Sequence, residues 1–203
     1  STSRLFTNGP FQNAGIKADY QISDRVGVMV GLFNDWNTTQ DFNGISDFGA
    51  QISLTPVDGW DIYLNYITGY HTAAFYTDFP GKVSEFDVTT GYQISDKLYL
   101  GLNFANASAK FDEGGEDGFT GFALYPQYAF SDAVSFGVRY ENFKWKESTS
   151  YNSFTFSLPI SSGPLRIIPE FRLDASSEDE FVNSDFSAVK SASQFLIAAI
   201  FTF

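Results

Sequence analysis

The amino-acid sequence predicts an all-β protein: an antiparallel, up-and-down transmembrane β-barrel of about 12 strands. Three observations predict this fold class. Apolar and polar residues alternate through stretches of about ten residues, short turns alternate with longer loops, and the chain ends on an alternating apolar strand at Phe203. Hydrophobic residues make up 43% of the chain, yet its mean hydropathy is only -0.13, as expected when every apolar row has a polar row beside it.

Tight turns divide the chain at regular intervals. In three of them an aromatic-ended strand runs into Ser-Asp and leaves as a new alternating strand. Ser and Asp suit such turns because their short side chains bond nearby backbone groups. The expected turns are Ser23-Asp24, Asp58-Gly59, Ser95-Asp96, Ser131-Asp132 and Ser162-Gly163.

The segments between turns and loops are the expected strands. They are residues 13–22, 25–34, 46–55, 60–70, 83–93, 97–107, 120–130, 133–143, 151–160, 165–174 and 187–203, in one barrel domain that spans 1–203. Bacterial single-chain barrels have an even number of strands, so a further strand is expected upstream of Ser1. An intact mass above 22.6 kDa would agree with that extension. A ten-strand barrel is the alternative count.

Each expected strand has one larger, more apolar face and one polar face. After the first turn, for example, Val28 and Val30 alternate with Gly27 and Met29. In a closed barrel the polar face lines the lumen, where its charges set ion preference. The candidate lumen residues are Lys17, Asp19, Arg25, Gln51, Asp61, Glu85, Asp87, Arg139, Glu141, Arg166, Glu170 and Arg172. Arg139, Arg166 and Arg172 would face Glu141 and Glu170 on neighbouring strands and form a ladder of charges across the lumen. The lumen itself is either open or plugged.

Two features favour lipid over a soluble β-sandwich, which would show the same alternation but bury its apolar face. Aromatic residues gather beside the turns, where rings with a polar handle settle at lipid headgroups. The expected girdle is Tyr20, Trp60, Tyr92, Tyr128 and Phe130. The last strand alternates through Phe195, Ile197, Phe201 and Phe203, and it resembles the C-terminal signature of outer-membrane barrels, which the barrel-assembly machinery reads.

Charge and motif content exclude several classes of function. A net charge of -12 argues against nucleic-acid binding, which needs clustered Lys and Arg. Acidic residues cluster in two expected loops, as Asp112, Glu113, Glu116 and Asp117 and as Glu178, Asp179 and Glu180. Neither cluster has calcium-loop spacing, so both are expected to be solvated rather than metal-binding. His71 is the only imidazole and no G-x-S-x-G motif occurs, so no catalytic residue, metal or cofactor is expected.

Two stretches carry a resemblance to a known family. Residues 3–36, SRLFTNGPFQNAGIKADYQISDRVGVMVGLFNDW, resemble a segment of the OmpL-like β-barrel porins, in which an S-R, L-F, N, P-F run precedes a G-[IV]-[KR] strand and a G-x-x-N-x-W strand end. Residues 51–70, QISLTPVDGWDIYLNYITGY, are similar to that family's next hairpin. The resemblance implies passive diffusion across a bacterial outer membrane and no catalytic residues. Family members are usually longer, so the chain would be a short relative or a partial one.

Two functions therefore remain open. The first is a pore for small hydrophilic solutes or ions, with outer-membrane lipid as its surroundings and a homo-oligomer as a possible assembly. The second is a non-conducting barrel that anchors a larger envelope complex through its acidic loops. Conductance in planar bilayers separates them, because a pore gives channel steps that change when Arg139 or Arg172 is neutralised.

Overall fold

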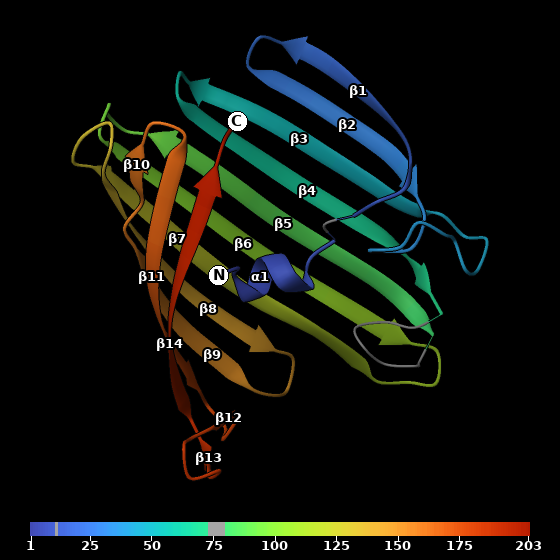
Figure 1. The fold of residues 1–203 in the computed structure, drawn as a ribbon. Coiled ribbons are helices and arrows are strands. Elements are labelled where there is room, and N and C mark those ends of the chain that lie inside the picture. The colour runs from blue at the N-terminus through green and yellow to red at the C-terminus, as the bar shows by residue number, and fades with distance from the viewer. Residues whose placement is uncertain (11, 73–79) are drawn as a thin grey trace.

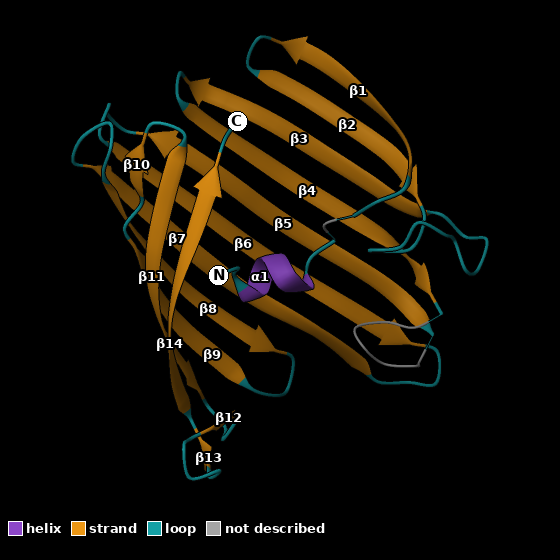
Figure 2. Ribbon diagram, in the orientation of Figure 1, coloured by secondary structure: helices purple, strands orange, loops and turns teal. Residues whose placement is uncertain are grey.

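In the computed structural model, which describes residues 1–10, 12–72 and 80–203, the chain folds into one antiparallel sheet of 12 strands, a two-stranded hairpin and one short helix (Figures 1 and 2). The helix is α1 (Arg4–Asn8). The strands are β1 (Gly15–Ser23), β2 (Val26–Phe33), β3 (Asp47–Val57), β4 (Trp60–His71), β5 (Gly81–Gln93), β6 (Leu98–Phe111), β7 (Glu116–Ala129), β8 (Ser135–Trp145), β9 (Ser150–Ser157), β10 (Ile160–Ser162), β11 (Leu165–Ser176), β12 (Phe181–Val182), β13 (Ala188–Val189) and β14 (Ser191–Phe201).

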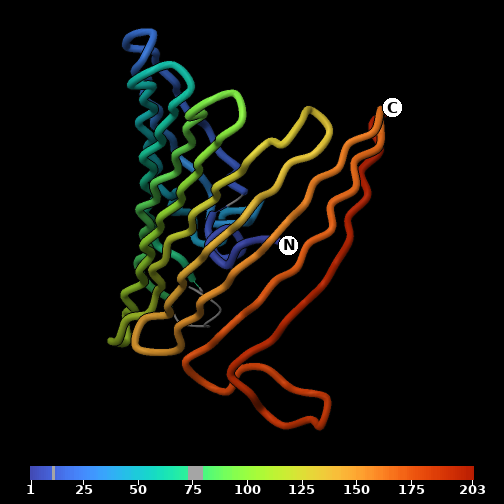
Figure 3. Tube along the Cα trace, turned by 90° about the vertical axis from the view of Figure 1, so that its left-hand side faces the viewer, coloured from blue at the N-terminus to red at the C-terminus, as the bar shows by residue number. Residues whose placement is uncertain are grey.

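The strands form the expected meander. From β1 to β9 each strand pairs with the next, β11 pairs with β9, β10 and β14, and every pairing is antiparallel. β12 and β13 form the separate hairpin within the loop before β14. Figure 3 shows the sheet from the side as one curved wall. No helix among the described residues is long and apolar enough to span a membrane.

The short turns lie where the sequence predicts them, and serine supplies the expected hydrogen bonds. The Oγ atoms of Ser23, Ser95 and Ser131 accept backbone N–H groups two or three residues further along, at 3.2 to 3.4 Å. Gly59 and Gly163 have positive φ angles of 80° and 56°, a region that glycine enters without steric cost. Local side-chain chemistry therefore sets these five hairpins.

The structure differs from the sequence-based prediction in the details that follow, and β7 also begins earlier than expected, at Glu116. The strand expected over 151–160 is divided into β9 and β10 around Pro159, because proline has no N–H for the ladder. The strand expected over 187–203 begins as the short β13, and its main part starts at Ser191. The helix α1 was not expected, and Figure 1 shows it on the concave side of the sheet.

The outer face of the wall carries the large apolar side chains. Val30, Phe86 and Phe195 are 50%, 42% and 65% exposed, and many similar residues alternate with inward-facing ones on the same strands. Contiguous exposed apolar rows are unusual on soluble proteins and are the surface that lipid covers in a membrane barrel. The soluble β-sandwich is therefore ruled out, because its apolar rows would lie between two layers.

The candidate lumen face

A row of amide and carboxylate side chains crosses the inner face of β3 to β6. Strand register sets Gln51 opposite Asn65 and Asn65 opposite Asp87, so their side chains point to the same side of the sheet. Gln51 Nε2 donates to Asn65 Oδ1 at 2.6 Å, and Asn65 Nδ2 donates to Asp87 Oδ1 at 2.6 Å. Asn103 Nδ2 donates to Asp87 Oδ2, also at 2.6 Å. Neutral amides, rather than cations, thus surround the Asp87 carboxylate.

Glu85 lies two residues before Asp87 on β5, so its side chain is on the same face of the sheet. It is only 5% exposed, and its Oε2 has no hydrogen-bond partner among the described residues. A buried carboxylate oxygen without a partner is unfavourable unless water or a cation reaches it. Glu85 and Asp87 together make this part of the inner face acidic.

The helix α1 covers a different part of the inner face, against β6 and β7 (Figure 1). Its N-cap, Ser3, accepts the backbone N–H of Phe6 at 3.0 Å. Leu5 is 3% exposed and belongs to an apolar cluster on the inner wall. The wall residues of this cluster are Ala105, Ala107, Phe119, Ala123, Phe143 and Tyr151. A Cβ atom at Gly121 would lie 3.0 Å from Leu5 Cδ2, so small residues leave the hollow that Leu5 fills.

Charged wall residues hold the backbone before and within α1. Glu141 is fully buried, and its Oε1 accepts the backbone N–H of Leu5 at 3.0 Å. Arg139 Nη1 donates to the carbonyl oxygen of Ser1 at 2.9 Å, and Arg172 Nη1 donates to that of Thr2 at 2.9 Å. Four of the five charges that the sequence suggested as a cross-lumen ladder therefore bind the segment of residues 1–10 that lies on the inner wall, called the inserted segment below; the fifth, Arg166, does not.

The other charged side chains of that region also have hydrogen-bond partners. Arg172 Nε lies 2.8 Å from Asp174 Oδ2, and Ser153 Oγ donates a short hydrogen bond to the same carboxylate. Glu170 accepts a hydrogen bond from Ser1 Oγ. Arg166 shares this face by register but is exposed beside the last short turn. The alternation of β11 thus puts acid and base on one side, as its sequence indicates.

A cavity of about 590 Å³ separates the inserted segment from the wall of β2 to β6. The inserted segment contributes Ser3, Leu5, Phe6, Gly9 and Pro10, and the polar wall residues are Gln51, Asn65, Glu85, Asp87, Thr89, Thr90, Tyr99, Asn103 and Tyr125. The lining includes two carboxylates, and among its described residues it includes neither lysine nor arginine. The described lining of the cavity therefore carries acidic side chains but no basic ones.

Among the remaining candidate lumen residues, Lys17 and Asp19 lie on β1 at the edge of the sheet, and Arg25 and Asp61 lie beside short turns. Lys17 Nζ lies 3.2 Å from Asp19 Oδ2, with both side chains more than half exposed. Arg25 Nη1 donates to the Pro56 carbonyl at 2.7 Å, and Asp61 accepts a hydrogen bond from Thr55 Oγ1 at 2.8 Å. A pore-lining role for the whole set stays a prediction.

The roles predicted for the aromatic girdle and for the C-terminal strand also stay predictions. Trp60 and Tyr92 have ring centroids 5.6 Å apart, and those of Tyr128 and Phe130 are 5.4 Å apart, in both cases beside short turns. Tyr20 is 70% exposed beside the first turn. Phe195, Ile197, Phe201 and Phe203 are all exposed along the last strand.

The acidic loop residues have varied surroundings. Glu116 forms an ion pair with Lys146 at 2.5 Å, Asp112 accepts a hydrogen bond from the Tyr70 hydroxyl, and Glu180 accepts one from Thr149. Within the described ranges, the carboxylate and imidazole groups that lie close enough to share a metal ion are elsewhere, at Asp35, Asp47 and His71. The sequence singled out His71 but gave it no partners.

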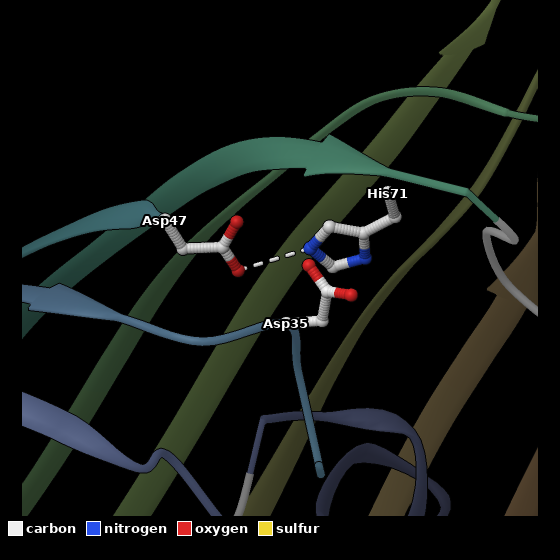
Figure 4. Close-up of side chains that lie close together, drawn as sticks. All are labelled: Asp35, Asp47 and His71. Atoms are coloured by element: carbon white, nitrogen blue, oxygen red, sulfur yellow. Dashed lines mark hydrogen bonds and ion pairs between the residues drawn. The ribbon is translucent and has the colours of Figure 1, made fainter. Parts of the chain in front are cut away.

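Figure 4 shows how these three side chains converge at the loop end of the wall. Asp47 begins β3, His71 ends β4, and Asp35 lies in the loop before β3. His71 Nε2 lies 2.9 Å from Asp47 Oδ2, and all three residues are buried. Burial raises the pKa of Asp35 above its ordinary value, and the repulsion of Asp47 adds to this, although the Phe42 N–H and His71 act in the opposite direction.

Comparison with known proteins identifies the family. The sequence model of the family described as "Putative beta-barrel porin-2, OmpL-like" matches residues 1–203. Outer membrane protein U of Vibrio parahaemolyticus is 26% identical over 154 residues, which are 76% of this chain and 40% of that protein.

Solved porin structures share the fold. An anion-selective porin from Comamonas acidovorans aligns with a TM-score of 0.70 at 12% identity, over 91% of this chain and 58% of that one. OmpT of Vibrio cholerae aligns with a TM-score of 0.64 at 16% identity, over 91% of this chain and 63% of that one. The chain spans less than two thirds of the length of these relatives. Its fold class is confirmed as that of the outer-membrane β-barrels, and the chain belongs to the OmpL-like β-barrel porin family of the bacterial outer membrane.

Proposed function

We propose that the protein is a porin-like channel for passive diffusion of small hydrophilic solutes, and that it prefers cations. The observation that carries the proposal is the cavity of about 590 Å³ between the inserted segment and the wall of β2 to β6. The polar groups of its lining would bind water, and the Asp87 carboxylate would attract cations. The protein would work as a monomer or homo-oligomer in outer-membrane lipid, after insertion by the barrel-assembly machinery.

The distribution of charge supports the preference for cations. Arg139 and Arg172 donate to backbone carbonyl oxygens of the inserted segment, and neither is among the described residues that line the cavity. The Asp87 carboxylate accepts hydrogen bonds from neutral amides, and no cation among the described residues is paired with it. A solute in the cavity would therefore meet acids that no basic side chain of the lining neutralises.

Planar-bilayer recordings of the purified full-length protein test the proposal. In a salt gradient the wild-type channel should show stable steps and a reversal potential on the cation-selective side. Asp87→Asn should move the reversal potential towards that of an unselective pore. Glu178→Gln, which makes the same charge change in an exposed loop, should leave it unchanged.

Two outcomes would overturn the proposal. Reversal on the anion-selective side would contradict the cation preference. A folded protein that stays silent in bilayers and copurifies with a fixed partner would support the non-conducting anchor instead.

A further inference from the structure

We propose that Asp35, Asp47 and His71 form a binding site for a divalent transition-metal ion of the Zn²⁺ class, at the loop end of the inner wall. The three residues come from separate segments, namely the β2–β3 loop, the first residue of β3 and the last residue of β4. Each offers one ligand atom, and these atoms lie within 4.8 Å of one another. This site is independent of the channel function proposed above.

The spacing suits a single ion with little rearrangement. Zinc bonds to nitrogen and carboxylate oxygen are about 2.0–2.2 Å long, so ligand atoms around one ion lie within roughly 4 Å of each other. His71 Nε2 and Asp47 Oδ2 are already 2.9 Å apart. Asp35 extends towards the same imidazole in Figure 4. A small movement of its loop would bring the third ligand into the sphere.

Unsatisfied buried oxygens point independently to a cation ligand. Asp47 is fully buried and Asp35 is 5% exposed, and Oδ1 of each has no hydrogen-bond partner among the described residues. Two ionised carboxylates facing one imidazole would place a net negative charge in a buried site. Such an arrangement is costly in a low-dielectric site, and a dication would neutralise it.

The surroundings fix the ligands in place. A Cβ atom at Gly69 would lie 1.4 Å from Asp47 Oδ1, so only glycine leaves room for this carboxylate. Trp36 packs edge-on against the His71 ring, with centroids 5.7 Å apart. Asp35 Oδ2 accepts the backbone N–H of Phe42 at 3.4 Å, which restrains the carboxylate from within its own loop. These contacts preorganise the two ligands that the strands carry.

The ligand types select the class of metal. Ca²⁺ and Mg²⁺ prefer six or more oxygen ligands, whereas an imidazole with two carboxylates suits Zn²⁺ and its neighbours in the first transition row. Water would complete the coordination sphere. A bound ion would join the β2–β3 loop to the adjacent ends of β3 and β4, so it would hold that loop over the inner wall.

The test uses the full-length protein, purified without a polyhistidine tag and stripped with a chelator. A calorimetric titration with ZnCl₂ should show that one ion binds per chain. Excess Mg²⁺ or Ca²⁺ should not displace it. The imidazole NMR signals that disappear in His71→Gln should shift when Zn²⁺ binds. His71→Gln and Asp35→Asn should each weaken the affinity at least about tenfold, and Glu178→Gln should not change it.

Asp35 lies outside the strands, so Asp35→Asn tests the site even if replacement of a strand residue impairs folding. Circular dichroism should show wild-type strand content for any variant that is scored. Absence of Zn²⁺ binding to folded wild-type protein would overturn the proposal. So would an affinity that is the same in wild type, Asp35→Asn and His71→Gln, because the ion would then bind elsewhere.

Discussion

Replacing Leu5 by alanine should release α1 from the inner wall while leaving the sheet folded. Leu5 is the buried residue of the helix, and it fills a hollow among alanines and Gly121. The bond from its backbone N–H to Glu141 does not depend on the side chain. The sheet pairings do not involve α1, so the effect should fall on docking of the segment rather than on the stability of the strands.

The size of the effect follows from burial. Truncation of a buried leucine to alanine costs about 2–5 kcal/mol. Because about 1.4 kcal/mol is a factor of ten, the docking equilibrium should fall by roughly 30-fold to several thousand-fold. A segment docked by only a few kcal/mol would then be largely undocked, and the passage beside it would widen.

A spin label at Thr7 measures docking directly. Thr7 lies on the exposed side of α1, and the chain contains 0 Cys, so Thr7→Cys gives the chain one labelling site. Its spectrum should be immobile in the parent and mobile once Leu5→Ala is added, and single-channel conductance should rise. Leu32→Ala makes the same deletion on the outer face, where Leu32 is 52% exposed, and should change neither readout. An immobile label in the Leu5→Ala protein would refute the docking argument.

Three further predictions concern other contacts. Gly69→Ala should displace the Asp47 carboxylate and abolish Zn²⁺ binding by calorimetry without any change of charge, because the added Cβ would lie 1.4 Å from Asp47 Oδ1. Tyr151→Leu removes the ring that lies 3.8 Å below the Arg4 guanidinium, so it should weaken docking of α1 by about 0.5–2 kcal/mol, seen as a partly mobile Thr7 label. Ser131→Ala removes the acceptor in the β7–β8 turn and should lower the free energy of unfolding in urea by about 0.5–1.5 kcal/mol; an unchanged denaturation midpoint would contradict the role given to serine.

Much of the fold is predictable because its signals are local. A period of two in hydrophobicity identifies a strand and its faces from a few residues, and Ser-Asp or Asp-Gly identifies the turn that follows. These signals locate the strands of the sheet to within a few residues at most ends. The start of β7 was not predicted by these local signals, because β7 begins at Glu116 in a segment whose acidic composition indicates a loop.

The candidate metal site could not be predicted because it depends on register. The β3–β4 ladder begins with Val57 opposite Trp60, and an uninterrupted ladder would set Phe48 opposite Gly69. Pro56 has no N–H to donate, and the ladder shifts by one residue between Leu54 and Val57. Phe48 therefore pairs with Thr68, and Asp47 moves beside Gly69 and His71. Proline suggests a bulge, but the composition of the turn alone does not fix its direction.

Docking of α1 was missed for a related reason. The inner face of β6 carries Ala105, Ala107 and Ala109, and β7 adds Gly121 and Ala123. From the sequence such small residues indicate only a weakly polar face. In three dimensions they form a shallow region in an otherwise polar wall, which a leucine from the inserted segment can fill. A block of alanine on the inward register is the signal that would have predicted an inserted segment.

These features divide the inner face into two parts with different consequences for transport. On the side of β6 to β11, the apolar cluster, Glu141 and the arginines are occupied by the inserted segment. On the side of β2 to β5, the amide row, Glu85 and Asp87 face the cavity. In the proposed channel, a solute that passes the segment would run beside Asp87. The width of the passage would then depend on the Leu5 contact and its charge preference on Asp87. Because these are separate sets of contacts, their mutational effects should add.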